Sequence, residues 1–210
     1  MKTRIFIFKK HRPDRKALDE TVRVLREGGV AVFPTDTVYG IGASVFRPQA
    51  IRRIYKLKGR SYKKPFPVLV SDVKQALALV EPPDARLRRL LKKYWPGPLT
   101  VVFNTSSLGR WTTGGRETLA LRIPAHPAAL ALLKKMGQPL AVTSANKSGQ
   151  PEAVTGAAAR RLFGGKVDVI IDGGRRPRGV PSTVLDVSST VWTLAREGAV
   201  TKAELLRYLN

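Results

Sequence analysis

The sequence predicts an α/β protein built on an open, twisted and mixed β-sheet with helices packed on it. Short β-branched or apolar runs alternate with amphipathic stretches along the chain, as such a sheet requires. Polar clusters follow several apolar runs directly, where an open α/β sheet holds its ligand loops. The 210 residues contain no internal repeat or low-complexity tract, so we expect one domain that covers residues 1–210.

Helices are expected where a capping residue or a proline precedes an amphipathic stretch. Asp14 is the expected cap of the first helix, which Gly28 and Gly29 end. Two further helices are expected to begin with a proline, one from Pro48 to about 56 and one over 127–136. Four more are expected to follow a capping residue: Ser71 or Asp72 for a helix that ends near 80, Asp84 for one that ends near 94, Thr155 for one over 156–163, and Thr201 for one that ends at 209.

Strands are expected where β-branched and aromatic residues form short runs between turn residues. The expected strands cover 5–8, 30–33, 68–70, 99–103, 119–123, 140–142, 167–171, 183–187 and 191–196. Residues 34–43 and 143–154 are expected as polar loops with ligand-binding chemistry. Residues 104–118 are polar and contain glycine, which predicts a mobile surface loop.

The charge balance and the scarcity of cysteine and histidine limit the kinds of function and site that the protein can have. The chain has 38 Lys and Arg against 15 Asp and Glu residues, a net charge of +23, which indicates either a polyanionic partner or a uniformly basic, solvated surface. Eight basic residues and no acid lie between Arg47 and Lys64, so the charge is clustered. The absence of cysteine excludes disulfides, thiolate zinc sites and a cysteine nucleophile, and two histidines do not favour a histidine-built metal site.

Several standard signals are missing from the sequence. No apolar run approaches the roughly 18 residues of a membrane span, and the amino-terminal apolar stretch is too short for a signal peptide, so a cytoplasmic protein without membrane contact is expected. There is no Walker A loop, and Gly40-Ile41-Gly42 lacks the third glycine of the dinucleotide fingerprint. A Gly-x-Ser-x-Gly elbow is also absent, which argues against a serine hydrolase.

Three polar clusters nevertheless indicate a single anion site: residues 34–43, Lys58-Gly59-Arg60 and Ser144-Ala145-Asn146. With Leu121-Arg122-Ile123-Pro124 and Ser182-Thr183-Val184, they resemble the ordered motifs of the YrdC-like family of threonylcarbamoyl-AMP synthases. That family carries Pro-Thr-Asp/Glu-Thr-x-Tyr-Gly, then Lys-x-Arg, then Ser-x-Asn. The resemblance covers roughly residues 18–200 and fits the short, single-domain form of the family.

The resemblance implies a nucleotidyltransferase that condenses L-threonine, bicarbonate and ATP into L-threonylcarbamoyladenylate and pyrophosphate. This is the first step of tRNA threonylcarbamoyladenosine modification, so a tRNA-modifying threonylcarbamoyl transferase complex is the implied partner, with direct contact to tRNA or double-stranded RNA a further expectation. The carbamate formed from threonine is its own nucleophile. The protein must therefore align the reactants and neutralise phosphate charge, usually with Mg²⁺, and no residue is assigned as a metal ligand.

The resemblance also implies roles for individual residues. ATP would be contacted by Arg60, Lys64, Thr118, Ser144 and Arg196. Lys58 and Asn146 would complete the phosphate surroundings, and with Arg60 and Ser144 they form the expected catalytic set. L-threonine would be held by Thr35, Arg122 and Ser182, with the Arg122 guanidinium clamping its carboxylate. Longer family members place a histidine in the threonine pocket, at the position of Leu69 here.

Two alternative functions stay open. A non-catalytic module of the same fold could hold double-stranded RNA or tRNA on a basic surface, and a paralogue could keep the fold without the activity. Taken singly, Lys58 and Lys64 could also be solvated surface residues, and Thr35 and Ser144 could be turn and loop formers. Asp36 is expected to cap its own turn, with a metal or a hydroxyl as the alternative partner.

Overall fold

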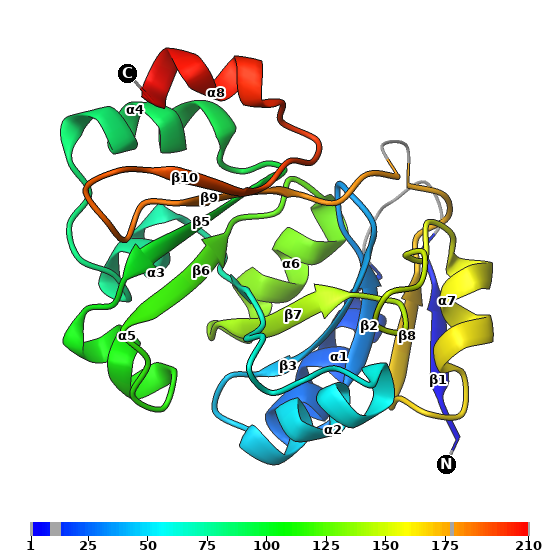
Figure 1. Ribbon diagram of the computed structural model, residues 1–210. Coiled ribbons are helices and arrows are strands. Elements are labelled where there is room, and N and C mark those ends of the chain that lie inside the picture. Colours follow the sequence, from blue (N-terminus) through cyan, green and yellow to red (C-terminus); the bar gives the residue numbers. More distant parts are fainter. Residues whose placement is uncertain (1, 9–13, 177–178, 210) are drawn as a thin grey trace.

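The computed structural model describes residues 2–8, 14–176 and 179–209. Within these ranges ten strands form one sheet in the order β1-β8-β2-β3-β7-β4-β6-β5-β9-β10 (Figure 1). The pairs β1–β8, β8–β2, β4–β6 and β5–β9 are parallel, and the remaining pairs are antiparallel. The expected α/β class with an open mixed sheet is confirmed.

Apart from two elements that lie in segments expected as loops, the helices and strands follow the expected order along the chain. The strands are β1 (Arg4–Ile7), β2 (Ala31–Pro34), β3 (Tyr39–Ser44), β4 (Val68–Leu69), β5 (Leu99–Asn104), β6 (Thr118–Arg122), β7 (Leu140–Ser144), β8 (Val169–Asp172), β9 (Thr183–Asp186) and β10 (Thr193–Arg196). The helices are α1 (Arg15–Arg26), α2 (Pro48–Lys58), α3 (Val73–Ala78), α4 (Ala85–Tyr94), α5 (Ser107–Thr112), α6 (Pro127–Met136), α7 (Gly156–Phe163) and α8 (Lys202–Leu209).

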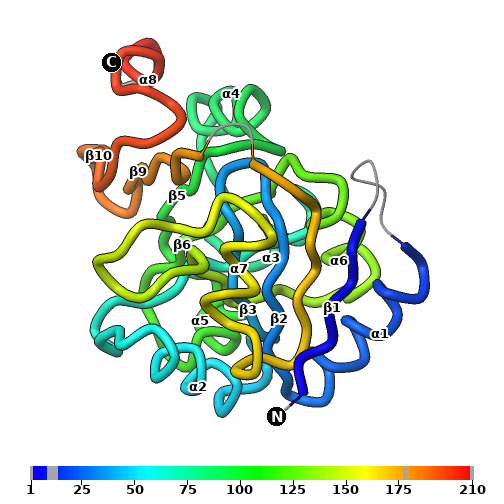
Figure 2. Tube along the Cα trace, turned by 90° about the vertical axis from the view of Figure 1, so that its right-hand side faces the viewer, coloured from blue at the N-terminus to red at the C-terminus, as the bar shows by residue number. Residues whose placement is uncertain are grey.

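The part of the sheet around β2 is covered on both faces. Ala31 and Phe33 pack into one apolar cluster with α1 and α6, whereas Val32 packs into another with α2 and α7. Successive side chains of a strand point to opposite faces, so a continuous apolar run is what a strand buried on both sides needs. Figure 2 shows α1 and α6 on one side of β2, with α2 and α7 on the other.

The part of the sheet around β5 and β6 is covered differently on its two faces. Val101 and Leu121 pack into a cluster with α3, α4 and α8, and α4 and α8 lie together over β9 and β10 (Figure 1). Their neighbours Thr100 and Ala120 point to the opposite face, where they line a cavity. The alternation along β5 and β6 therefore separates an apolar core from the floor of that cavity.

Two expected loops contain regular structure. Residues 39–44, expected within a loop, form β3 and pair with β2 and β7. Glycine is required at 42 because a Cβ there would lie 2.7 Å from Cγ2 of Val142. Because glycine is uncommon in strands, the glycines that let β3 lie this close to β7 also remove the usual sequence pattern of a strand. Residues 107–112, expected within a surface loop, form α5, which is capped by Ser106 accepting from the Gly109 N–H at 3.1 Å.

Smaller differences affect two of the polar clusters. Lys58 does not follow its helix but is the last residue of α2, which Gly59 ends in the left-handed conformation at φ 62°. Ser144 likewise lies in β7 rather than in a loop.

The caps at Asp14, Asp84 and Thr155 are confirmed, and of the two candidates at 71 and 72 the cap is Asp72. Among the described residues, no helix combines the length and apolar character needed to cross a bilayer.

Replacing Gly109 with alanine is expected to destabilise the protein, although Gly→Ala in a helix normally stabilises. The added Cβ would overlap the main-chain oxygen of Leu79, and overpacking of this kind costs about 1–3 kcal/mol. The free energy of unfolding from urea titrations would measure the effect. The control is Leu108→Ala on the same helix, at an exposed side chain. An increase in stability for Gly109→Ala would contradict the packing of α5 on Leu79.

Candidate active site

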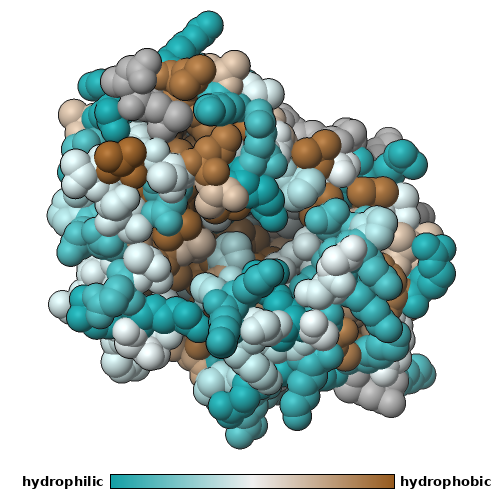
Figure 3. All heavy atoms as spheres, viewed as in Figure 1, coloured by the Kyte–Doolittle hydropathy of each residue, from teal (hydrophilic) through white to brown (hydrophobic). Residues whose placement is uncertain are grey.

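A cavity of about 980 Å³ opens between the two parts of the sheet, above β4, β6 and β7. Figure 3 shows it as a hollow in the middle of this face, with apolar side chains visible inside. The cavity is lined by seven of the predicted site residues, namely Thr35, Arg60, Thr118, Arg122, Ser144, Ser182 and Arg196. Leu69 lines it too. Lys58, Lys64 and Asn146 lie outside the lining: Lys58 and Asn146 are buried behind the wall, and Lys64 is exposed.

Two arginines supply positive charge inside the cavity. The Arg60 guanidinium donates from Nε to the Lys64 carbonyl at 2.9 Å and lies over the Phe66 ring. Arg196 donates from Nη2 to the Ser182 carbonyl at 2.7 Å. Burial lowers the pKa of both guanidiniums. For Arg196, the charge of Glu152 opposes this shift and the charge of Arg60 adds to it. Two desolvated cations that line the same cavity favour the binding of an anion that would neutralise them.

Lys58 and Asn146 hold together, from behind, the cavity wall that carries Arg60 and Ser144. The Lys58 ammonium donates to the Ser144 carbonyl at 2.5 Å, to the Asn146 carbonyl at 2.8 Å and to Asn146 Oδ1 at 2.6 Å. Ser144 Oγ donates to the same Oδ1 at 2.8 Å. The Lys-x-Arg and Ser-x-Asn segments, more than 80 residues apart in sequence, therefore bind each other. Arg60 and Ser144 line the cavity, while Lys58 and Asn146 fix the shape of its wall.

Residues 35–38, between β2 and β3, form a turn at another part of the cavity. This turn, called the Thr35 turn below, is held by Arg122. Arg122 Nη2 donates to Asp36 Oδ1 at 2.6 Å and Nη1 donates to Thr37 Oγ1 at 3.1 Å. Thr35 Oγ1 donates to the Val38 carbonyl at 2.6 Å. Only 7% of the Arg122 side chain and 11% of the Asp36 side chain are exposed. This ion pair thus places the charge of Arg122 at the cavity wall beside the Thr35 hydroxyl.

Sequence reasoning missed the role of Asp36. Its Oδ1 accepts from Arg122 and from the Ala125 N–H at 3.0 Å, so it joins two distant segments instead of capping its own turn. One signal could have indicated this pairing. A buried arginine needs a counter-charge, and the chain has few acidic residues that could supply it.

Arg176, which the sequence also did not single out, lies behind the same turn. Its Nη1 donates to the Thr35 carbonyl at 3.4 Å, and its guanidinium lies over the ring of Tyr39. Burial raises the pKa of Tyr39 to about 12, so its hydroxyl stays protonated and donates to the Gly174 carbonyl. These contacts fasten the segment after β8 to the Thr35 turn.

Replacing Asp36 with asparagine is expected to lower the free energy of unfolding by about 3 kcal/mol, because the buried Arg122 charge would lose its counter-charge. Glu117→Gln is the control, since it breaks the exposed Arg110–Glu117 pair and should cost less than about 1 kcal/mol. Urea titrations measure both. Equal small losses in the two variants would show that the Asp36–Arg122 pair contributes no more than a surface pair.

The stability contributed by Lys58 is expected to depend on pH. Burial lowers its pKa from 10.5 to about 8, so between these values the unfolded chain binds a proton that the folded chain does not. Stability relative to a Lys58→Met variant should therefore rise as the pH increases through this window. Unfolding titrations across the window measure it, with the exposed Lys64→Met as the control. A difference that stays flat or falls would mean that the three acceptors keep the ammonium charged.

Comparison with known proteins identifies the family of this chain. The Sua5/YciO/YrdC family, described as "Telomere recombination", matches residues 23–198. A threonylcarbamoyl-AMP synthase of Bacillus subtilis is 38% identical over 188 residues, which cover 89% of this chain and 54% of the relative. One of Coxiella burnetii is 36% identical over 172 residues, which cover 81% of this chain and 92% of the relative. The chain spans about half the length of the Bacillus subtilis relative and of a similar Pyrococcus abyssi relative.

Solved structures show the same fold. Pyrococcus abyssi Sua5 complexed with L-threonine matches with a TM-score of 0.92 and 35% identity, over 99% of this chain and 61% of that one. Escherichia coli YciO matches with a TM-score of 0.84 and 26% identity, over 94% of this chain and 96% of that one. Since the family matches most of the chain and the Coxiella burnetii relative is covered almost end to end, this protein belongs to the Sua5/YciO/YrdC family.

Proposed function

We propose that this protein condenses L-threonine, bicarbonate and ATP into L-threonylcarbamoyladenylate and pyrophosphate in the cytoplasm. The observation that carries the proposal is the convergence of Thr35, Arg60, Arg122, Ser144 and Ser182 on one cavity from separate parts of the chain. The names of the relatives and the L-threonine in the Pyrococcus abyssi Sua5 structure support it.

The reaction needs alignment and charge neutralisation more than a protein nucleophile. The threonine amine combines with bicarbonate to give a carbamate and water. A carbamate oxygen then forms a bond to the α-phosphorus of ATP, and the bond to the leaving pyrophosphate breaks. Charge develops on phosphate oxygens during this step, and fixed guanidinium and hydroxyl donors stabilise such charge most when water is excluded. Arg60 and Arg196 are guanidinium donors at the cavity wall. The Ser144 hydroxyl, which donates to Asn146 Oδ1 here, would turn its proton toward the phosphates.

The two substrates are assigned to different parts of the cavity. L-threonine would lie against Thr35, Arg122 and Ser182, with its carboxylate toward Arg122. ATP would lie against Arg60, Ser144, Thr118 and Arg196. Lys64, which lies outside the lining, would have to reach the phosphates from the exposed 61–65 segment.

Magnesium would enter with the nucleotide. The described residues contain no group of three His, Asp or Glu side chains that could hold a metal ion. Phosphate oxygens and water would therefore supply most of its ligands, as is common for Mg²⁺ in phosphoryl-transfer sites.

The product suggests the partner. A threonylcarbamoyl group joined to AMP is a reactive mixed anhydride, so a tRNA-modifying threonylcarbamoyl transferase complex would have to receive it. Binding of tRNA or double-stranded RNA without chemistry is the alternative function, and the net charge of +23 is the observation that favours it.

The proposed reaction predicts pyrophosphate release from ATP that requires both threonine and bicarbonate. Arg60→Ala is expected to slow this release by about 100-fold or more, and Ser144→Ala by a smaller factor, because each removes a donor to the phosphates. Arg161→Ala is the matched control, since it removes an exposed positive charge on α7, away from the cavity. Coupled pyrophosphate detection and mass spectrometry of the adenylate measure the reaction. Absence of threonine-dependent release by the wild-type protein would reject the enzyme and leave the RNA-binding module.

A further inference from the structure

The solvent-facing side of helix α4 is cationic. The apolar side of this helix packs into the core with β5 and β6. The rest of the helix carries five cations and no acid, namely Arg86, Arg88, Arg89, Lys92 and Lys93. Residues three and four apart in a helix are neighbours on its surface, so Arg88, Arg89 and Lys92 form one group on the side opposite the core. These three exposed residues are called the α4 stripe below.

The two cations at the margin of this side each lie over an aromatic ring. The Arg86 guanidinium is 3.9 Å from the centroid of the Trp192 ring, and the Lys93 ammonium is 5.6 Å from that of Tyr208. The face of an aromatic ring attracts a cation through its partial negative charge. Contacts within the protein therefore account for the positions of Arg86 and Lys93.

The three cations of the α4 stripe have no partner of opposite charge. Arg88 Nε donates to the Pro83 carbonyl, a neutral acceptor, at 2.8 Å. Among the described residues, no carboxylate forms an ion pair with a member of the stripe. The charges of the stripe therefore face solvent without a counter-charge from the protein.

The solvent-facing side of α1 shows that an exposed helix of this protein can be charge-balanced. Arg23 pairs with Glu20 at 2.7 Å and with Glu27, directly after the helix, at 2.8 Å. Asp19 pairs with Lys135 of α6. Contact with water alone therefore does not require a surplus of one sign, and the surplus on α4 needs a different explanation.

The α4 stripe lies outside the cavity. Helix α4 packs on the face of β5 and β6 that is opposite to the cavity, and it lies over β9 and β10 in Figure 1. No residue of α4 lines the cavity. A ligand bound to the stripe would therefore leave the cavity open to small substrates.

The composition of the stripe favours a nucleic acid over a protein as its partner. Protein interfaces have an apolar or aromatic centre and are depleted of lysine. None of the large exposed apolar side chains of the described residues belongs to α4, so a protein would find no such centre there. Arginine and lysine clustered along one helix instead match the repeated negative charge of a phosphate backbone.

We propose that the α4 stripe is a docking surface for the phosphate backbone of RNA. Each cation of the stripe would contact a phosphate and release a counterion from the RNA, so binding would depend strongly on salt and little on base sequence. RNA is preferred to DNA because the product of the proposed reaction is destined for tRNA, and in this choice the inference rests on the proposed function. The presence of the stripe does not depend on that reaction.

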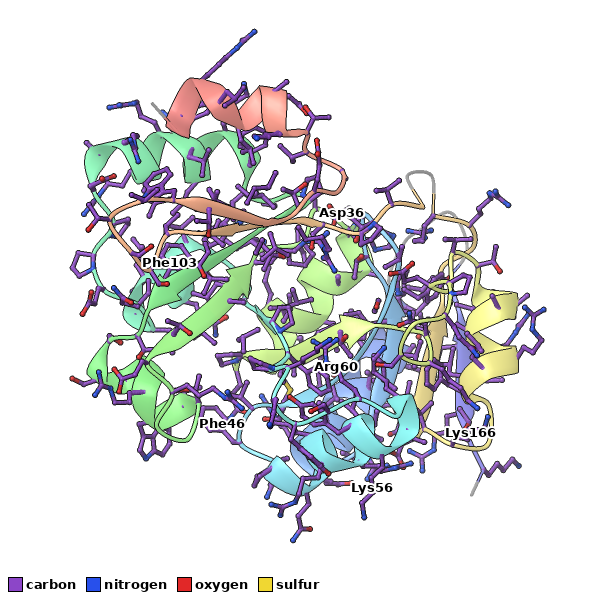
Figure 4. All side chains as sticks on the ribbon, viewed as in Figure 1. Asp36, Phe46, Lys56, Arg60, Phe103 and Lys166 are labelled. Carbon is purple, nitrogen blue, oxygen red and sulfur yellow. The ribbon has the colours of Figure 1, made fainter. Side chains whose placement is uncertain are left out.

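The competing location is the side of the molecule formed by α2 and α7. Lys56 of α2, Lys147 after β7 and Arg161 of α7 are also exposed, and among the described residues they too form no ion pair. They come from three separate elements, whereas the stripe lies within one helix. In Figure 4 Lys56 lies at the bottom of the view, far from α4 at the top, so the two locations can be tested separately.

Anisotropy of a fluorescently labelled RNA duplex, measured over a series of salt concentrations, tests the proposal. Arg88→Gln/Arg89→Gln/Lys92→Gln removes the stripe, and Lys56→Gln/Lys147→Gln/Arg161→Gln removes the same charge elsewhere. Loss of three phosphate contacts is expected to lower the slope of log K against log salt by about 3 and to weaken binding by at least about tenfold. The matched control should change both far less, because exposed charges are screened beyond roughly 8 Å at physiological ionic strength.

Two further variants separate loss of charge from loss of structure. Arg88→Lys/Arg89→Lys keeps the charge and should retain the wild-type slope. Glutamine has nearly the helix propensity of arginine and lysine, so the triple variant should keep α4, which circular dichroism measures. If the triple variant does not fold, Arg89→Gln alone carries the test, with an expected slope change of about 1.

Three results would overturn the proposal. Equal losses in the two triple variants would show that binding follows net charge alone. A larger loss in the control would place the docking surface on α2 and α7. Weak binding by the wild-type protein without salt dependence would leave the stripe without an RNA partner. The proposed reaction is judged separately, by threonine-dependent pyrophosphate release, which the stripe variant should retain at the wild-type level.

Discussion

The hydrogen bonds of the buried Lys58 ammonium are the interaction on which the cavity wall with Arg60 and Ser144 depends. The three acceptors of the ammonium are the Ser144 carbonyl and both oxygens of Asn146, so it joins the end of α2 to the end of β7. Taking an ammonium out of water costs several kcal/mol unless such acceptors surround it, and the two segments therefore have to meet in this geometry. Arg60 and Ser144, the wall residues next to these contacts, take their positions from it.

The Thr35 turn is fixed by the same physical means. Arg122 reaches it from β6 through Asp36 and Thr37, and Arg176 reaches it from the segment after β8 through the Thr35 carbonyl. Buried guanidiniums with several directed donors specify orientation as well as distance. The hydroxyl and the positive charge proposed to meet threonine are consequently set by side chains that themselves lie largely out of solvent.

The fold leaves room for a substrate because one face of β5 and β6 is apolar and helix-covered, whereas the opposite face carries Thr100, Ala120 and Arg122 toward the cavity. Fixed charges on this floor and wall need no reorganisation during a reaction, which suits the proposed alignment of a nucleophile that the substrate itself carries.

The sequence by itself determined the α/β class, nearly all helices and strands, and seven of the residues that line the cavity, because capping residues, apolar periodicity and ordered motifs are local signals. It did not reveal β3, whose glycines at 40 and 42 conceal the strand pattern, or α5. It also could not separate Arg60 and Ser144, which line the cavity, from Lys58 and Asn146, which brace it. Only the tertiary structure decided this, and likewise the pairing of Asp36 with Arg122, because the partner of a buried charge is chosen by long-range packing rather than by neighbours in sequence.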